Sequence, residues 1–70
     1  MDKLEEFMNA CGLASLGVEV RYWPYDRRKF EISAFELDEV YWGTGYTIEE
    51  AVKELAQKLA LGNPAFKEFT

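Results

Sequence analysis

Residues 43–59, GTGYTIEEAVKELAQKL, carry the sharpest structural signal in the chain. Thr47 followed three positions later by Glu50 is a capping box, in which the threonine hydroxyl accepts from the amide of Glu50 and the Glu50 carboxylate accepts from the amide of Thr47. The apolar side chains that follow at helical spacing are Ile48, Val52, Leu55 and Leu59. The pattern predicts a loop at 43–46 and then an amphipathic helix that Gly62 and Pro64 bring to an end.

Three strands are predicted upstream of that helix, at residues 18–25, 29–35 and 39–43. The first two alternate between apolar and polar positions. Their apolar positions are Val18, Val20 and Tyr22 in the first strand, and Phe30, Ile32 and Ala34 in the second. The connections, at 26–28 and at Leu37-Asp38, are too short for a crossover, so the strands form an antiparallel meander.

A further helix is predicted at residues 2–11. Asp2 is a candidate N-cap. Four apolar side chains share one helical face: Leu4, Phe7, Met8 and Cys11. Gly12 is expected to close this helix in a left-handed conformation.

The predicted fold class is therefore α+β, with the element order α-β-β-β-α. Both amphipathic helices must bury an apolar face, and the simplest arrangement lays them on one face of the three-stranded antiparallel meander as a two-layer domain. Residues 1–70 are expected to form a single domain, of which 63–70 is a C-terminal tail. Phe66 and Phe69 in that tail are candidates for packing back onto the domain.

Composition narrows the classes of function. Eight basic against thirteen acidic residues give a net charge of −5, which disfavours nucleic acid and anionic membranes as partners. A single cysteine, Cys11, leaves no intrachain disulfide, and no apolar run approaches the length of a membrane span. We therefore expect a cytoplasmic protein without a membrane partner.

No residue pattern in the sequence indicates catalytic chemistry. The chain contains no histidine, no phosphate-binding loop and no metal-ligand spacing. Its carboxylate clusters lie at predicted helix starts and a turn, where solvated carboxylates are normal. We predict that the chain is not an enzyme, with no catalytic, cofactor-binding or metal-binding residues, and that Cys11 is a small core residue.

Aromatic side chains are the strongest candidates for binding. If Val18, Val20 and Tyr22 face the helices together with Trp42 or Val40, the opposite face of the sheet is uncovered. The predicted partner-binding residues on that face are Trp23, Tyr25, Phe35 and Tyr41. Two alternatives stay open: the tail covers this face, or the register is shifted by one residue, which would exchange the two faces.

The first hairpin turn is the one basic segment. Arg27, Arg28 and Lys29 are candidates for binding a phosphate or a carboxylate. A solvated hairpin tip is the alternative interpretation.

The element order resembles that of the double-stranded-RNA-binding domain over residues 2–61. Lys29-Phe30-Glu31-Ile32 is similar to that family's second strand, and Val40–Gly45 to its third strand and glycine-containing turn. The resemblance implies RNA binding through basic residues at the start of the last helix. Here those positions are Ile48, Glu49, Glu50 and Ala51, so we predict a similar fold without the RNA-binding chemistry.

A second, weaker resemblance covers residues 18–61. Gly45-Tyr46-Thr47-Ile48-Glu49-Glu50-Ala51 is similar to the opening of the last helix in the HicB-like antitoxin family. That family covers and neutralises a small RNA-cleaving partner. This chain differs in its N-terminal helix and lacks an appended DNA-binding segment.

The leading prediction is a small acidic protein-binding module that acts as an inhibitor, antitoxin-like neutraliser or adaptor, in the manner of phage or mobile-element accessory proteins. Its partner would be a protein with a basic surface, such as one that handles nucleic acid. The alternatives are a double-stranded-RNA-binding domain that uses Arg27, Arg28 and Lys29, and a homodimer that buries the aromatic face.

Overall fold

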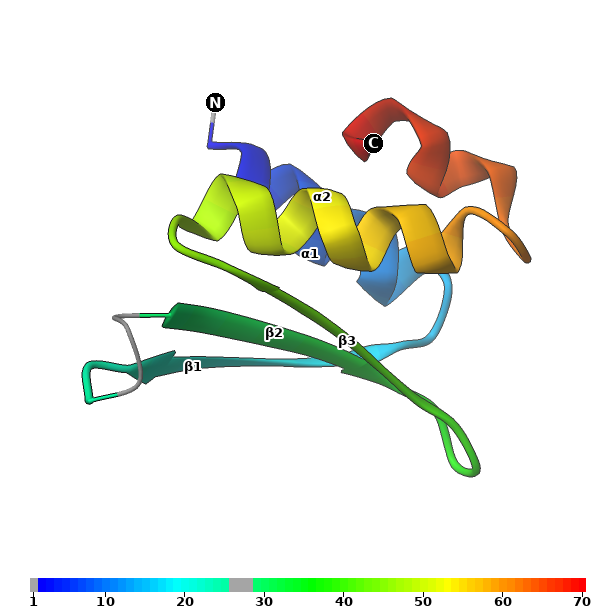
Figure 1. The fold of residues 1–70 in the computed structure, drawn as a ribbon. Helices are drawn as coiled ribbons and strands as arrows, with labels where there is room; N and C mark the ends of the chain where they lie inside the picture. The colour runs from blue at the N-terminus through cyan, green and yellow to red at the C-terminus, as the bar shows by residue number, and fades with distance from the viewer. Residues whose placement is uncertain (1, 26–28) are drawn as a thin grey trace.

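The computed structural model describes residues 2–25 and 29–70, and it shows a helical layer above a twisted three-stranded sheet (Figure 1). In chain order the elements are α1 (Lys3–Leu13), β1 (Gly17–Trp23), β2 (Lys29–Phe35), β3 (Val40–Gly45), α2 (Ile48–Leu59) and the 3₁₀ helix η1 (Pro64–Phe69). The α+β class and the order α-β-β-β-α are confirmed.

The sheet is an antiparallel meander in the order β1-β2-β3. Ile32 in the central strand pairs with Val20 on one side and Gly43 on the other, and Ser33 pairs with Glu19 and Trp42. Because side chains alternate along each strand, Val20, Ile32 and Gly43 point to one face and Glu19, Ser33 and Trp42 to the other. The first of these faces lies under the helices.

The third strand extends further than predicted, to Gly45, and its side chains alternate the other way: the residues expected to face the helices point away from them. Thr44 and Gly45, expected in a loop, pair with Glu31 and Phe30. At Gly43 a Cβ atom would collide with the Ala51 carbonyl oxygen and lie 2.6 Å from the Leu55 amide nitrogen. The backbone of α2 therefore rests directly on the strand here, and this close approach requires glycine on the helix side.

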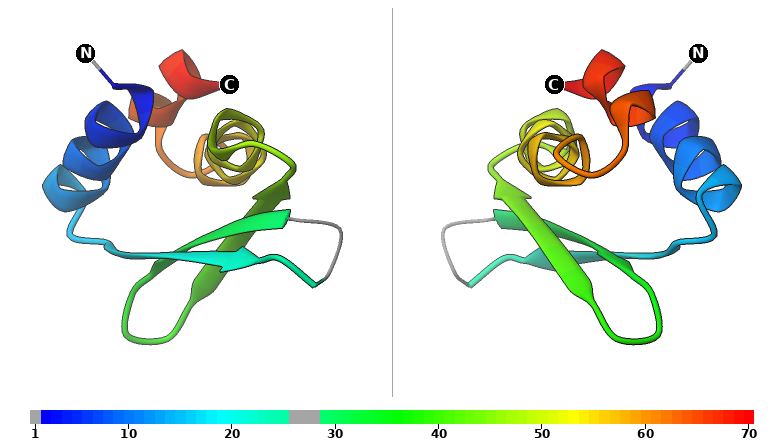
Figure 2. Two further views of the ribbon diagram at one scale, coloured as in Figure 1. Left: turned by 90° about the vertical axis from the view of Figure 1, so that its left-hand side faces the viewer. Right: turned by 90° about the vertical axis from the view of Figure 1, so that its right-hand side faces the viewer.

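The core lies between the sheet and the two helices. Its fully buried side chains include Ile32 and Ala34 from the sheet, Leu55 from α2, and Phe7 and Cys11 from α1. Seen end-on, α1 and α2 stand apart above the sheet, and η1 lies over the space between them (Figure 2). Both helices thus cover one face of the sheet, as predicted.

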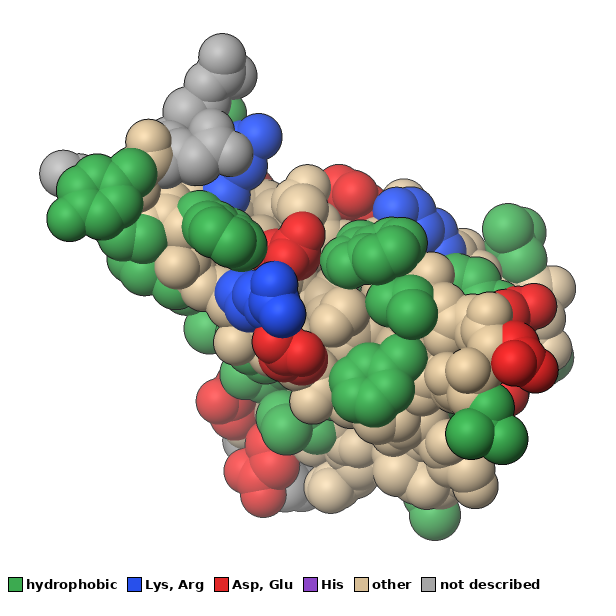
Figure 3. Space-filling model, turned by 90° about the horizontal axis from the view of Figure 1, so that it is seen from below, with side chains coloured by type: hydrophobic (Ala, Val, Ile, Leu, Met, Phe, Trp, Pro, Cys, Tyr) green, Lys and Arg blue, Asp and Glu red, His purple; other side chains and the backbone are tan. Residues whose placement is uncertain are grey.

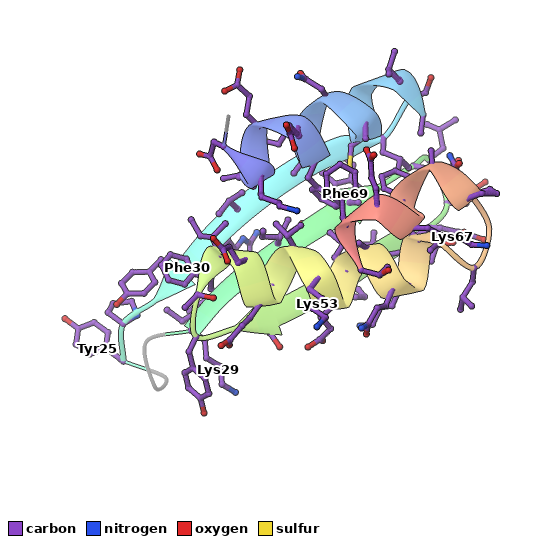
Figure 4. All side chains as sticks on the ribbon, turned by 90° about the horizontal axis from the view of Figure 1, so that it is seen from above. Tyr25, Lys29, Phe30, Lys53, Lys67 and Phe69 are labelled. Atoms are coloured by element: carbon purple, nitrogen blue, oxygen red, sulfur yellow. The ribbon has the colours of Figure 1, made fainter. Side chains whose placement is uncertain are left out.

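The C-terminal tail completes this helical layer. Phe66 and Phe69 contact Phe7 edge-on, with ring centroids 5.8 and 5.4 Å apart, and both tail rings are buried. In the view from above, Phe69 reaches in between the helices (Figure 4). The tail therefore packs on the helix side of the molecule and leaves the opposite face of the sheet open.

The helix caps differ from expectation in detail. Asp2 and Thr47 are N-caps, as predicted, and accept hydrogen bonds from the amides of Leu4 (3.0 Å) and Glu50 (3.1 Å). The Glu50 carboxylate, however, accepts from the amide of Tyr46 at 2.9 Å rather than from that of Thr47. It reaches one residue further back, so it ties the end of the β3–α2 connection to the first turn of α2.

The end of α1 was predicted wrongly. Gly12 lies within the helix and has no positive φ, and the helix continues to Leu13. Ser15 takes the left-handed conformation instead, with φ of 62°. The Leu16 amide donates back to the Cys11 carbonyl at 2.8 Å, so this hydrogen bond closes the helix two residues later than the glycine suggested.

Candidate protein-binding face

The face of the sheet turned away from the helices, here called the outer face, is the candidate site. Seen from below, it presents hydrophobic side chains with lysine, arginine and acidic side chains between them (Figure 3). Neither helix nor tail crosses this side of the sheet (Figures 1 and 2). The outer face is therefore open to a partner across the full width of the three strands.

Three apolar side chains from neighbouring strands form a cluster on this face. Phe35 pairs directly with Val40 across β2 and β3, and Trp42 follows Val40 two residues later on the same face. Their exposed fractions are 40%, 45% and 50%. Gly17 makes room for this cluster on its other side, because a Cβ atom there would collide with the Phe35 ring.

A charged group lies beside the apolar cluster. Arg21 Nε donates to Glu19 Oε1 at 2.6 Å, and Arg21 pairs across the strands with Glu31. The hydrogen bond from Arg21 to Glu19 and the charge of Glu19 raise the pKa of the guanidinium, with a smaller contribution from Glu31. The guanidinium is therefore charged and lies within hydrogen-bond distance of the Glu19 carboxylate.

Between the apolar cluster and the charged group lies a shallow hollow of about 420 Å³. It is lined by Glu19, Arg21, Glu31, Ser33, Phe35, Val40 and Trp42. One wall is therefore aromatic and aliphatic, and the other carries two carboxylates and one guanidinium. A partner side chain with an apolar stem and a cationic head meets a suitable surface at each end.

Of the four predicted partner-binding residues, Trp23 and Phe35 lie on the outer face. Trp23 is 46% exposed at the end of β1, opposite Lys29. Tyr25 lies beyond the strand, fully exposed, and extends past the end of the sheet (Figure 4).

Tyr41 lies on the other face, so its predicted orientation was wrong. It packs against the core, and its hydroxyl donates to the Glu39 carboxylate. That hydrogen bond is the main reason why the pKa of Tyr41 is raised.

The predicted orientation of Val40 and Trp42 was wrong for the same reason. Gly43 must face α2, so Tyr41 and Gly45 face it too, whereas Val40, Trp42 and Thr44 point outward. The sequence carries a signal for this arrangement: glycines spaced by two, directly before a helix, indicate a strand against which a helix packs closely.

The predicted anion-binding residues are described only in part. Arg27 and Arg28 lie outside the described residues. Lys29 is the first residue of β2, half-buried, and pairs with Trp23.

Other reactive groups lie away from the outer face. Cys11 is fully buried in the core, and burial raises the pKa of its thiol to about 11. Within residues 2–25 and 29–70, His, Cys, Asp and Glu side chains form no cluster suited to a metal ion. Among the same residues, no helix is both long and apolar enough to cross a membrane.

Comparisons with protein-family models, with curated proteins and with solved structures gave no match to this chain. The resemblances to the double-stranded-RNA-binding domain and to HicB-like antitoxins stay predictions.

Proposed function

We propose that this chain is a small acidic protein-binding module without catalytic activity, which uses its outer face to cover a basic surface on a partner protein. The observation that carries the proposal is the cluster of Phe35, Val40 and Trp42, each at least 40% exposed on a sheet face that nothing in the described fold covers. Exposed apolar patches of this kind mark interaction sites. Tryptophan is among the commonest anchors of protein interfaces.

The charge of the chain supports a basic partner. The net charge is −5, so long-range attraction favours positively charged proteins and opposes nucleic acid. In the hollow, a lysine or arginine from the partner has the Trp42 ring on one side and, on the other, the carboxylates of Glu19 and Glu31 with the Arg21 guanidinium between them. Arg21 is hydrogen-bonded to Glu19, so Glu31 is the carboxylate left to attract the partner's charge. Proteins that handle nucleic acid present such basic surfaces, and covering one is the action of an inhibitor, an antitoxin-like neutraliser or an adaptor.

The test compares three immobilised proteins for capture from the source cell: the wild type, Trp42→Ala and Tyr46→Ala. Tyr46 is 58% exposed but precedes α2, away from the hollow, so it is the matched control for loss of an exposed aromatic side chain. A basic protein retained by the wild type and Tyr46→Ala, released by salt and absent from Trp42→Ala, supports the proposal. With the captured protein purified, Trp42→Ala should weaken its Kd by about 30-fold, which corresponds to the roughly 2 kcal/mol of an interface anchor. Equal capture by all three proteins contradicts the proposal.

Duplex RNA, the alternative ligand, has less support. α2 begins with Glu49 and Glu50, and the Glu50 carboxylate is held at that end by the Tyr46 amide. Two carboxylates at this position repel phosphate. In a gel-retardation assay at physiological salt we expect no complex with duplex RNA at micromolar protein, and a salt-sensitive complex at lower concentration would restore the RNA-binding alternative.

A further inference from the structure

β1 is an edge strand that lies open on both faces along most of its length. Within the part of the chain that the structure describes, β1 pairs with β2 on one side and with no strand on the other. Residues 19–23 are all exposed. On the helix side, Val18 packs against the core, but Val20 and Tyr22 are 40% and 49% exposed. A long open edge with apolar side chains is a ready template for another strand.

Two charges lie on this edge, and their positions are symmetric. Glu19 and Arg21 flank Val20 and both point to the outer face. Single charges on an edge strand normally oppose pairing with another copy. Here the charges have opposite signs, so an antiparallel second copy meets each charge with its complement.

We propose that a second copy of this chain pairs antiparallel with β1, in the register that places Val20 opposite Val20. In this register Glu19 lies opposite Arg21 of the second copy, and Arg21 opposite its Glu19. Moving the centre by one residue places either Glu19 opposite Glu19 or Arg21 opposite Arg21. Like charges directly across a strand pair are destabilising, and the register centred on Val20 is the one that places each charge opposite its complement, so the charges favour this register.

The remaining cross-strand pairs of this register are also compatible. On the helix side, Val18 lies opposite Tyr22 of the second copy, which buries apolar surface that the monomer leaves exposed. On the outer face, Gly17 lies opposite Trp23. Because the Phe35 ring already covers Gly17, the second copy's Trp23 comes to lie beside Phe35, an aromatic contact across a glycine.

Pairing of this kind joins two sheets of three strands into one continuous sheet. The two-fold axis runs perpendicular to the sheet, so both outer faces point the same way and both helical layers lie on the opposite side. The dimer thereby presents two copies of the hollow to one partner surface, which adds to the proposed function without depending on it.

The first test exchanges the charges. In sedimentation equilibrium, Glu19→Arg and Arg21→Glu should each weaken self-association at least tenfold, because each variant places like charges opposite one another. Mixing the two variants should give a heterodimer, since an edge strand with two arginines then faces an edge strand with two glutamates. The variant that carries both changes should dimerise like the wild type. Both side chains are about half exposed, so circular dichroism should show that all variants are folded.

The second test traps the register and does not depend on the charge variants. Val20→Cys should form an intermolecular disulfide under mild oxidation, because residues directly opposite in an antiparallel pair have Cα atoms roughly 4.5–5.5 Å apart. Tyr22→Cys is the matched control: it lies on the same strand and face, but two copies of residue 22 are several residues apart in this register. The native Cys11 is fully buried and does not compete.

A wild-type chain that stays monomeric at millimolar concentration overturns the proposal. Equal cross-linking of Val20→Cys and Tyr22→Cys, or an equimolar mixture of folded charge variants that stays monomeric, overturns the register. Trp42→Ala should leave the dimer intact, because Trp42 lies two strands away from the paired edge. Its effect on partner capture is therefore separable from dimerisation.

Discussion

Replacing Gly43 by alanine tests the feature that orients β3 and thereby places Trp42 on the outer face. A Cβ atom at residue 43 would collide with the Ala51 carbonyl oxygen and lie 2.6 Å from the amide nitrogen and 2.7 Å from the Cβ atom of Leu55. Most of these neighbours are helix backbone atoms, which no rotamer change can move away. Accommodating the methyl group therefore requires α2 to lift from the sheet.

The expected loss of stability for Gly43→Ala follows from this geometry. Overpacking a close-packed contact costs typically about 1–3 kcal/mol, and rigid backbone neighbours place this site near the upper end. For a domain of this size, about 2–3 kcal/mol corresponds to a fall in Tm of roughly 8–24 °C. A core this small supplies only about 3–5 kcal/mol in total, so the variant should be close to unfolding at room temperature.

Gly12→Ala is the matched control, because the same methyl group is added inside α1 where nothing lies within 4 Å. Alanine is the better helix former by roughly 0.5–1 kcal/mol, so this variant should melt a few degrees higher than the wild type. Both variants are compared by thermal and urea unfolding followed by circular dichroism. If Gly43→Ala is as stable as Gly12→Ala, then Gly43 does not face α2 and the assignment of Trp42 to the outer face fails with it.

Three further changes test other parts of the structure. Thr47→Ala removes the hydroxyl that accepts from the Glu50 amide, which should cost about 1 kcal/mol and lower the Tm by roughly 4–8 °C. Thr47→Ser keeps a hydroxyl at this position and should be about as stable as the wild type. Phe66→Ala removes a buried ring that packs on Phe7 and should cost roughly 3–5 kcal/mol. That is about the whole stability of a core this small, so circular dichroism should find this variant largely unfolded without urea, whereas Trp42→Ala should be folded; the reverse result would mean that the tail is dispensable. Burial raises the pKa of Cys11 to about 11, so the folded chain keeps this thiol neutral at a pH where the unfolded chain already loses the proton. The free energy of unfolding should therefore decline as the pH rises through about 9 to 11. A Cys11→Ala variant should show a smaller decline, which begins only where Tyr41, whose pKa is also raised, titrates in the unfolded chain. Native Cys11 should be slow to react with thiol reagents at pH 8.

Much of the fold was readable from local patterns along the sequence. The capping residue Thr47 and the apolar stripe of α2 identified the last helix, and β2 was predicted with the bounds it has in the structure, residues 29–35. These signals are local, because a helix cap and a periodic apolar face each involve residues close together in the sequence. They can therefore be recognised without knowledge of the tertiary fold. The short connections between strands then left a meander as the simple topology.

What the pattern of apolar residues could not determine was which side of β3 faces the helices. Its alternation is ambiguous, because Val40, Tyr41 and Trp42 are all large and apolar, so either parity would bury a large side chain. Only the contact between α2 and the backbone at Gly43 settles the parity, and that contact joins residues eight or more positions apart. The position of the tail is likewise a tertiary outcome: Phe66 and Phe69 could serve either face of the sheet, and they pack where Phe7 and the space between the two helices leave apolar surface to bury. A one-residue shift in parity exchanges the two faces of a strand, which is why the tertiary structure, and not the pattern, placed Trp42 in the hollow and Tyr41 beneath the helix.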